Sequence, residues 1–138
     1  MTEAAFALPV FLLVVFGTLD LGIMVFRQHQ ITTAASALAR RAVVHGSESS
    51  KLGVWGPGSL SGTAADGSAI GKLLATQTAG ARPDAIRYEI SWPDGGNKAA
   101  SDHRVRVVVS ATHQPIVTGL FGVDPLTLSS STTSVIAH

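Results

Sequence analysis

Residues 1–26, MTEAAFALPVFLLVVFGTLDLGIMVF, decide the fold of this chain. After Glu3 the residues are almost all apolar up to Phe26, and the one charged residue among them is Asp20. A helix needs about 20 apolar residues to cross the hydrocarbon core of a bilayer, so this stretch is long enough. An acid inside hydrocarbon costs roughly 2.5–3.5 kcal/mol and usually meets a partner there. The segment is therefore expected to leave lipid and to pack against copies of itself.

A secretory signal peptide and a plain single-span anchor are two other interpretations of this segment. A secretory signal peptide has a basic n-region and a shorter apolar core, whereas the first three residues, Met1-Thr2-Glu3, carry no base. That interpretation is therefore disfavoured. A plain single-span anchor fits the length and stays open as an alternative.

The helical pattern continues beyond the apolar run. Ile31, Ala34, Leu38 and Ala42 recur at three- and four-residue spacing, which is the pattern of one helical face. Gly46 then provides a helix stop signal, because glycine readily adopts the backbone conformation that ends a helix.

The sequence thus predicts one helix from about Glu3 to His45, which at 1.5 Å per residue would be roughly 65 Å long. We expect residues 3–26 to form the transmembrane or filament-core half and residues 27–45 to form a protruding half. Pro9 lies inside the helix and predicts a kink, because proline removes one hydrogen bond of the helix ladder.

Residues 46–138 are predicted to form a small α+β head packed on the long helix. The Gly- and Ser-rich residues 46–68 predict a loop, in which Trp55 is the one large anchor. A short second helix is expected over residues 64–79. Three stretches show the residue preferences of strands, and we expect a three-stranded antiparallel sheet from Ile86-Tyr88-Ile90-Trp92, Val105-Val107-Val109-Ala111 and residues 126–135.

Composition narrows the function classes. The net charge is +1, and 14% of the residues are charged while 46% are hydrophobic. A chain with so little net charge has no field to attract nucleic acid. Cysteine is absent, so the head has no disulfide, and its stability must come from packing on the helix and on neighbouring subunits.

Motifs for catalysis, cofactors or metals do not emerge from the sequence. GSAIGK at residues 67–72 lacks the glycine spacing and the Ser/Thr of a phosphate-binding loop, and it is better interpreted as a helix start. The five histidines show no ligand spacing. We therefore expect no catalytic residues, no cofactor and no metal site.

The two acids of the apolar segment are the candidate functional groups. In a bundle of like helices, the Glu3 carboxylate can neutralise the N-terminal amine of a neighbour, an interaction that is strong away from water; the alternative is that it only complements the helix dipole. Three environments stay open for Asp20: water at the interface, Arg27 of its own or a neighbouring helix, or another intersubunit contact. Pairing across subunits is the one that we favour.

The order and spacing of these residues resembles the TadE-like pilins of tight-adherence (type IVc) pilus systems. The family typically carries a Glu, then Phe-Ala-Leu, then a Pro, and a Gly-x-x-(Asp/Glu)-x-Gly near the end of the apolar run. The resemblance spans about residues 3–45 and 104–137, and Ala4 departs from it because the family usually has an aromatic residue there. The residues that match are Glu3, Phe6, Pro9, Gly17, Asp20 and Gly22.

This resemblance implies a structural pilin-like subunit rather than an enzyme. Such a prepilin is cleaved by a prepilin peptidase, held in the bacterial inner membrane with its N-terminus in and its head outside, and assembled by an ATPase-driven platform into an extracellular pilus for adhesion. The implied partners are membrane lipid before assembly, identical or homologous pilin subunits, the peptidase and the platform, and no nucleic acid. The implied assembly residues are Glu3, Phe6, Pro9, Gly17, Asp20, Gly22 and Arg27.

Two alternatives stay open at this point. The chain could be a non-polymerising single-span membrane protein whose external head binds a ligand or partner. Within the pilus interpretation, a head of roughly 90 residues is large for the major subunit of this system and favours a minor component. A filament made mainly of this chain is the open alternative.

Overall fold

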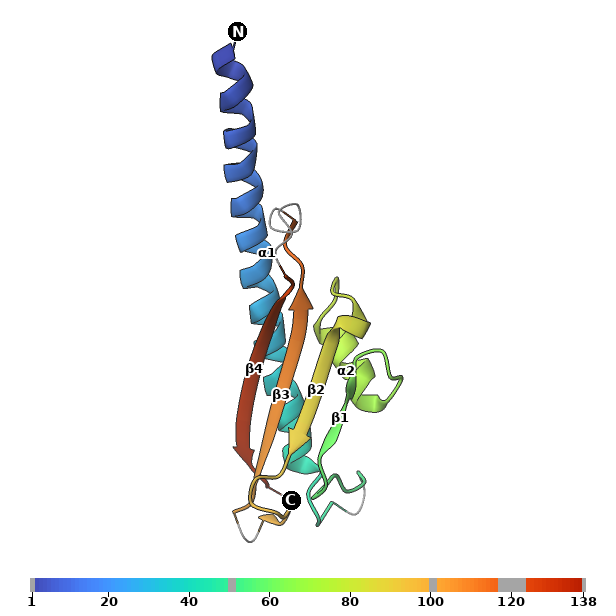
Figure 1. Cartoon of the computed structure of the whole chain (residues 1–138). Helices are drawn as coiled ribbons and strands as arrows, with labels where there is room; N and C mark the ends of the chain where they lie inside the picture. Colours follow the sequence, from blue (N-terminus) through green and yellow to red (C-terminus); the bar gives the residue numbers. More distant parts are fainter. Residues whose placement is uncertain (1, 50–51, 100–101, 117–123, 138) are drawn as a thin grey trace.

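A long helix and a four-stranded sheet make up the protein (Figure 1). The computed structural model describes residues 2–49, 52–99, 102–116 and 124–137, with side chains from residue 7 onward. One half of the helix lies behind the sheet, and the other half projects beyond it toward the N-terminus. The elements, in chain order, are α1 (Thr2–Val44), β1 (Leu60–Thr63), α2 (Ala69–Gln77), the 3-10 helix η1 (Pro83–Ala85), β2 (Ile86–Ser91), β3 (Arg104–His113) and β4 (Leu126–Val135).

Helix α1 confirms the predicted long helix and differs from it by one residue at each end. It contains 43 residues, which corresponds to about 65 Å at 1.5 Å per residue. The helix continues through Pro9, whose side chain is exposed.

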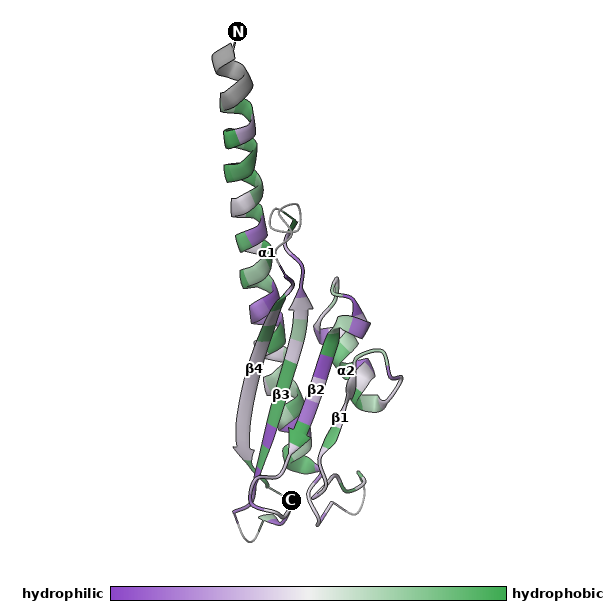
Figure 2. Cartoon of the chain, viewed as in Figure 1, coloured by the Kyte–Doolittle hydropathy of each residue, from purple (hydrophilic) through white to green (hydrophobic). Residues whose placement is uncertain are grey.

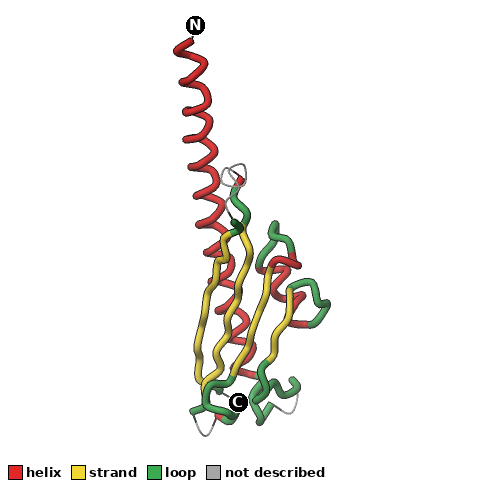
Figure 3. The backbone as a smooth tube through the Cα atoms, viewed as in Figure 1, coloured by secondary structure: helices red, strands yellow, loops and turns green. Residues whose placement is uncertain are grey.

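The sheet is an antiparallel meander in the order β1-β2-β3-β4, so each strand pairs with its neighbour in sequence (Figure 3). Strands β2, β3 and β4 confirm the three predicted strands. The prediction of three strands was wrong by one, because β1 lies inside the segment that was interpreted as a loop.

Strand β1 could not be predicted from the sequence, because it has only four residues, Leu-Ser-Gly-Thr, without an alternation of apolar and polar side chains. Its register places Gly62 opposite Tyr88. A Cβ atom at Gly62 would collide with the Asp66 carboxylate and would lie 2.7 Å from the Tyr88 hydroxyl oxygen. The Tyr88 hydroxyl donates to Asp66 Oδ2 at 2.9 Å, and both side chains lie close to Gly62. Position 62 therefore requires glycine because space is short there, and this glycine does not indicate a flexible loop.

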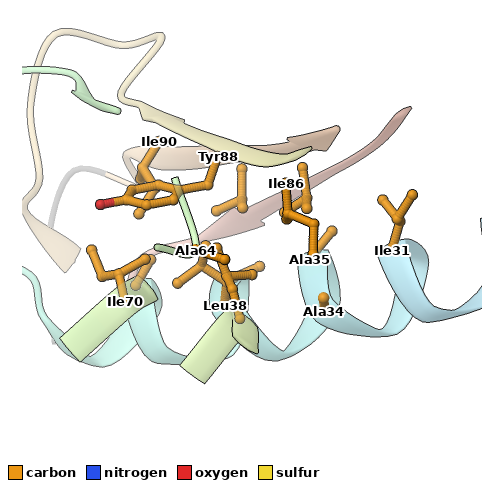
Figure 4. Close-up of a cluster of buried hydrophobic side chains, with 14 of the residues drawn as sticks. Ile31, Ala34, Ala35, Leu38, Ala64, Ile70, Ile86, Tyr88 and Ile90 are labelled. Carbon is orange, nitrogen blue, oxygen red and sulfur yellow. The ribbon is translucent and has the colours of Figure 1, made fainter. Parts of the chain in front are cut away.

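The core lies between α1 and the inner face of the sheet, as Figure 4 shows. Ala34 and Ala35 of α1 are fully buried, and their small side chains let the helix lie close to the strands. Residues of β2 and β3 alternate between the core and the exposed outer face. The large side chains that are fully buried in these three elements are Ile31, Leu38, Ile86, Ile90, Val105, Val107 and Val109.

Helix α2 is shorter than predicted, because the chain from residue 64 to 68 first completes the β1 edge and a turn. The backbone N–H of Ala64 still donates to Ile86. Ser68 is the N-cap, and its hydroxyl accepts the N–H of Gly71 at 2.9 Å. The interpretation of GSAIGK as a helix start is confirmed, although α2 begins at Ala69 and not at residue 64.

The loop after α1 is tied to the end of the head that lies farthest from the N-terminus. The rings of His45 and Trp55 stack with centroids 4.2 Å apart and planes at 6°. The side-chain amide of Asn97 donates to the Trp55 carbonyl at 2.8 Å. Trp55 is partly buried against the core, so the expected anchoring role of this tryptophan is confirmed.

Candidate functional site

The N-terminal half of α1 presents apolar side chains that nothing in the described chain covers. Figure 2 shows the projecting part of the helix as predominantly hydrophobic. Leu8 and Phe11 are 60% and 63% exposed, and residues 7–19 contain no buried position. By length and composition, the helix from Ala7 to Val44 is able to cross a membrane.

Five of the predicted assembly residues, Glu3, Phe6, Pro9, Gly17 and Gly22, lie on or near this projecting half. Glu3 and Phe6 belong to α1, but their side chains lie outside the described part of the structure. A Cβ atom at Gly17 or Gly22 would meet nothing within 4 Å. Both glycines therefore leave open surface, where the backbone of another helix can come close.

Among the side chains of α1 that the structure describes, from residue 7 onward, Asp20 is the first buried one, and it is 8% exposed. One carboxylate oxygen, Oδ1, accepts the backbone N–H of Ile116 at 3.0 Å. Ile116 belongs to the connection that follows β3, so the acid inside the apolar helix meets the head of its own chain. The predicted pairing of Asp20 across subunits is not tested by this contact.

Arg27, the seventh assembly residue, contacts the end of β3 instead of a carboxylate. Its Nη1 lies 2.8 Å from Nδ1 of His113. A guanidinium can only donate, so Nδ1 must accept, and the proton of the neutral imidazole is then on Nε2. Within the described ranges, the ion pairs are Arg82–Asp84 and Arg104–Asp94, and neither includes Arg27.

His113 is the residue of this region that sequence reasoning missed. Its side chain is 3% exposed, and Nε2 is buried without a hydrogen-bond partner among the described residues. Burial lowers the pKa of His113, the positive charge of Arg27 lowers it further, and the charge of Asp20 acts in the opposite direction. The signal that could have identified it is the alternation of β3, which carries the inward face from Val105 to position 113.

A groove of about 550 Å³ joins these residues to the projecting helix. Asp20 and His113 are among its lining residues, and Asp124 lies at the head side. The rest of the lining is mainly apolar and comes from one side of α1 and from the chain on either side of the β3–β4 connection. Those lining residues include Leu13, Gly17, Leu21, Met24, Pro115 and Leu126.

The described residues hold no group of three or more histidine, aspartate and glutamate side chains placed to bind a metal ion. Arg104 and Arg106 are exposed on the outer face of β3. Arg104 also makes a bidentate contact with Asp94, through Nη2 to Oδ1 at 2.8 Å and Nε to Oδ2 at 3.0 Å. This pair closes the β2–β3 connection and lies on the strand end far from the groove.

Residues 1–40 match the model of a family described as TadE-like protein. No curated protein and no solved structure matches the chain. The match confirms the N-terminal resemblance, whereas the resemblance over about residues 104–137 stays a prediction. Together, the match and the exposed apolar helix fit a membrane protein associated with a Tad pilus.

Proposed function

We propose that this chain is a structural, non-catalytic pilin-like subunit of a Tad-type (type IV) pilus. The observation that carries the proposal is the apolar surface of residues 7–19, which projects beyond the head on the same helix that matches the TadE-like family. An apolar surface of this extent is stable only when lipid or protein covers it. Lipid covers this surface before assembly, and protein covers it after assembly.

Before assembly, lipid covers the helix, with the N-terminus inside the bacterial inner membrane and the head outside. Asp20 is buried and accepts the backbone N–H of Ile116, which belongs to the head. Residues 2–19 would measure about 27 Å along the axis, close to the roughly 30 Å hydrocarbon core. Of the expected membrane segment 3–26, the last turns would then lie at the membrane surface beside the head.

After assembly, helices of identical or homologous subunits replace the lipid, and the heads lie on the outside of an extracellular pilus. Gly17 and Gly22 would allow close helix contacts, and Glu3 would be neutralised by a neighbouring subunit. A prepilin peptidase and an ATPase-driven platform are the proposed processing and assembly partners. Adhesion is the proposed use of the pilus, with this chain as a minor component.

Mass spectrometry of filaments sheared from the cell surface tests this function. The chain is expected in the sheared fraction, at an abundance that distinguishes a minor from a major subunit. Glu3→Ala should leave the membrane-inserted amount unchanged and remove the chain from that fraction. Glu48→Ala is the matched control, because Glu48 is exposed in the loop after α1.

The competing function is a single-span membrane protein whose head binds a ligand or partner without polymerising. It predicts that sheared material lacks this chain and that detergent extraction yields monomers. If the Glu3→Ala chain is instead found in sheared filaments in the same amount as the unsubstituted chain, the pilus assignment stands and the role of this acid is refuted.

A further inference from the structure

A pocket of about 280 Å³, separate from the groove, lies at the end of the head that faces the projecting half of α1. It is formed where β3 ends and where β2 and β4 begin, and Figure 1 shows these strand ends on the side of the projecting helix. Its volume is close to the lower limit of ordinary small-molecule sites, about 300–1,000 Å³. The pocket therefore suits a small chemical group and not a protein segment.

The pocket is positively charged. Its lining includes Arg27 and Arg82, and no aspartate or glutamate is among the described residues that line it. Thr112 and Gln114 add a hydroxyl and an amide to the lining, and both residues are exposed. Two guanidinium groups with neutral donors beside them suit an anion with several oxygen acceptors, such as a phosphate.

Both arginines have donors that a ligand can use. A guanidinium has five N–H donors, and the partly exposed Arg27 makes one hydrogen bond among the described residues, to His113. The side chain of Arg82 is 84% exposed, and its contact with Asp84 is long, at 3.4 Å. Exposed ion pairs contribute little, so a phosphate can compete with Asp84 for Arg82.

The pocket lies near the level of the lipid headgroups if residues 2–19 occupy the hydrocarbon core. The Cα atom of Arg27 is then about 12 Å beyond residue 19 along the helix axis. The headgroup layer adds roughly 5–8 Å on each side of the core. Side chains of a helix lean toward its N-terminus, so the long side chain of Arg27 extends back toward this layer.

We propose that this pocket binds the phosphate of an anionic phospholipid in the leaflet next to the head. The proposal rests on the membrane insertion of α1 in the proposed function and adds a specific lipid contact to it. Asp20 and Asp124 line the groove and not this pocket. A phosphate held by Arg27 and Arg82 would set the depth and the rotation of the head at the membrane surface.

Native mass spectrometry of the full chain in an uncharged detergent tests this contact. Phosphatidylglycerol should bind at least about fivefold more tightly than phosphatidylcholine with the same acyl chains, because the choline cation would face the two arginines. Arg82→Gln and Arg27→Gln should each weaken the binding of phosphatidylglycerol by about fivefold. Arg106→Gln is the matched control, since Arg106 is exposed on β3 outside the pocket and loses the same charge.

Arg82→Gln decides the test, because its exposed side chain is not needed for folding, whereas Arg27 also contacts His113. Unchanged binding in Arg82→Gln, an equal loss in Arg106→Gln, or equal affinities for the two lipids would overturn the proposal. Inorganic phosphate at millimolar concentration should not displace phosphatidylglycerol. Displacement would assign the pocket to free phosphate and refute the lipid as its ligand.

Failure of this contact is distinguishable from failure of the proposed function. If the lipid test fails while the chain is found in sheared filaments, the pilus function stands without the headgroup contact. If the chain is absent from sheared filaments, the pilus function fails, and the lipid measurement still decides the pocket.

Discussion

The carboxylate of Asp20 accepts the backbone N–H of Ile116 at 3.0 Å, across 96 positions of sequence. This bond joins the apolar helix to the chain that leaves β3. Asp20→Ala should lower the free energy of unfolding by about 1–3 kcal/mol, because a part-buried donor loses a charged acceptor. Asp20→Asn keeps a carbonyl oxygen and should cost less.

Urea denaturation of the detergent-solubilised chain measures this difference. Asp84→Ala is the control, since Asp84 takes part in an exposed ion pair with Arg82 and such pairs contribute little. Equal losses for Asp84→Ala and Asp20→Ala would show that the Ile116 contact is not stabilising.

Acidification should destabilise the head through His113. Its pKa lies below the ordinary 6.5, chiefly because the side chain is buried. The unfolded chain therefore binds the proton first, and the stability from the neutral form is complete above pH 6.5 and falls as the pH drops toward the folded pKa. The slope is at most about 1.4 kcal/mol per pH unit for one group.

Thermal melts between pH 7.5 and 5 measure this dependence. His113→Gln should flatten the profile, whereas His29→Gln should not, because His29 is exposed. A wild-type profile that is already flat would contradict the neutral buried imidazole.

A second acid transition is expected at lower pH from Asp94. Hydrogen bonds from the Arg104 side chain, with a further contribution from its backbone N–H, hold the pKa of Asp94 at about 2, below the ordinary 3.8. This carboxylate therefore contributes stability above about pH 4, and the contribution is lost as pH falls toward 2. Arg104→Ala should weaken that transition in an acid titration, while Arg106→Ala, an exposed neighbour on the same strand, should preserve it.

The helix–sheet contact should reject a larger side chain at Ala35. Because this residue is fully buried against the strands, Ala35→Leu should lower the free energy of unfolding by about 1–3 kcal/mol or more through overpacking. The same substitution at the exposed Ala7 introduces no clash and is the matched control. Denaturant midpoints of the two variants give the comparison, and equal midpoints would contradict the tight packing of α1.

Much of this fold follows from local patterns in the sequence. The helical face of Ile31, Ala34 and Leu38 and the alternation along β2 and β3 reflect burial on one side of each element, which repeats with a fixed period. Strand β1 has no such pattern, because Gly62 is selected by its contact with Tyr88 and not by burial.

The candidate site was harder to predict, because its contacts join distant residues. Asp20 could be recognised as an unusual acid, but its partner Ile116 could not, since a backbone N–H carries no sequence signal. His113 was set aside as one histidine among five without ligand spacing. Its importance comes from burial beside Arg27, 86 positions away, which only the folded chain reveals.

The sharing of one core between α1 and the sheet determines where the chain can be shortened. A fragment starting near residue 20 would keep every described helix side chain that the strands bury. It would remove the exposed apolar surface of the projecting half of α1. A fragment starting at residue 46 would lack Ile31, Ala35 and Leu38, and the inner face of the sheet would be exposed to water. The water-soluble form suited to crystallisation is therefore the head together with about the last seven turns of its helix.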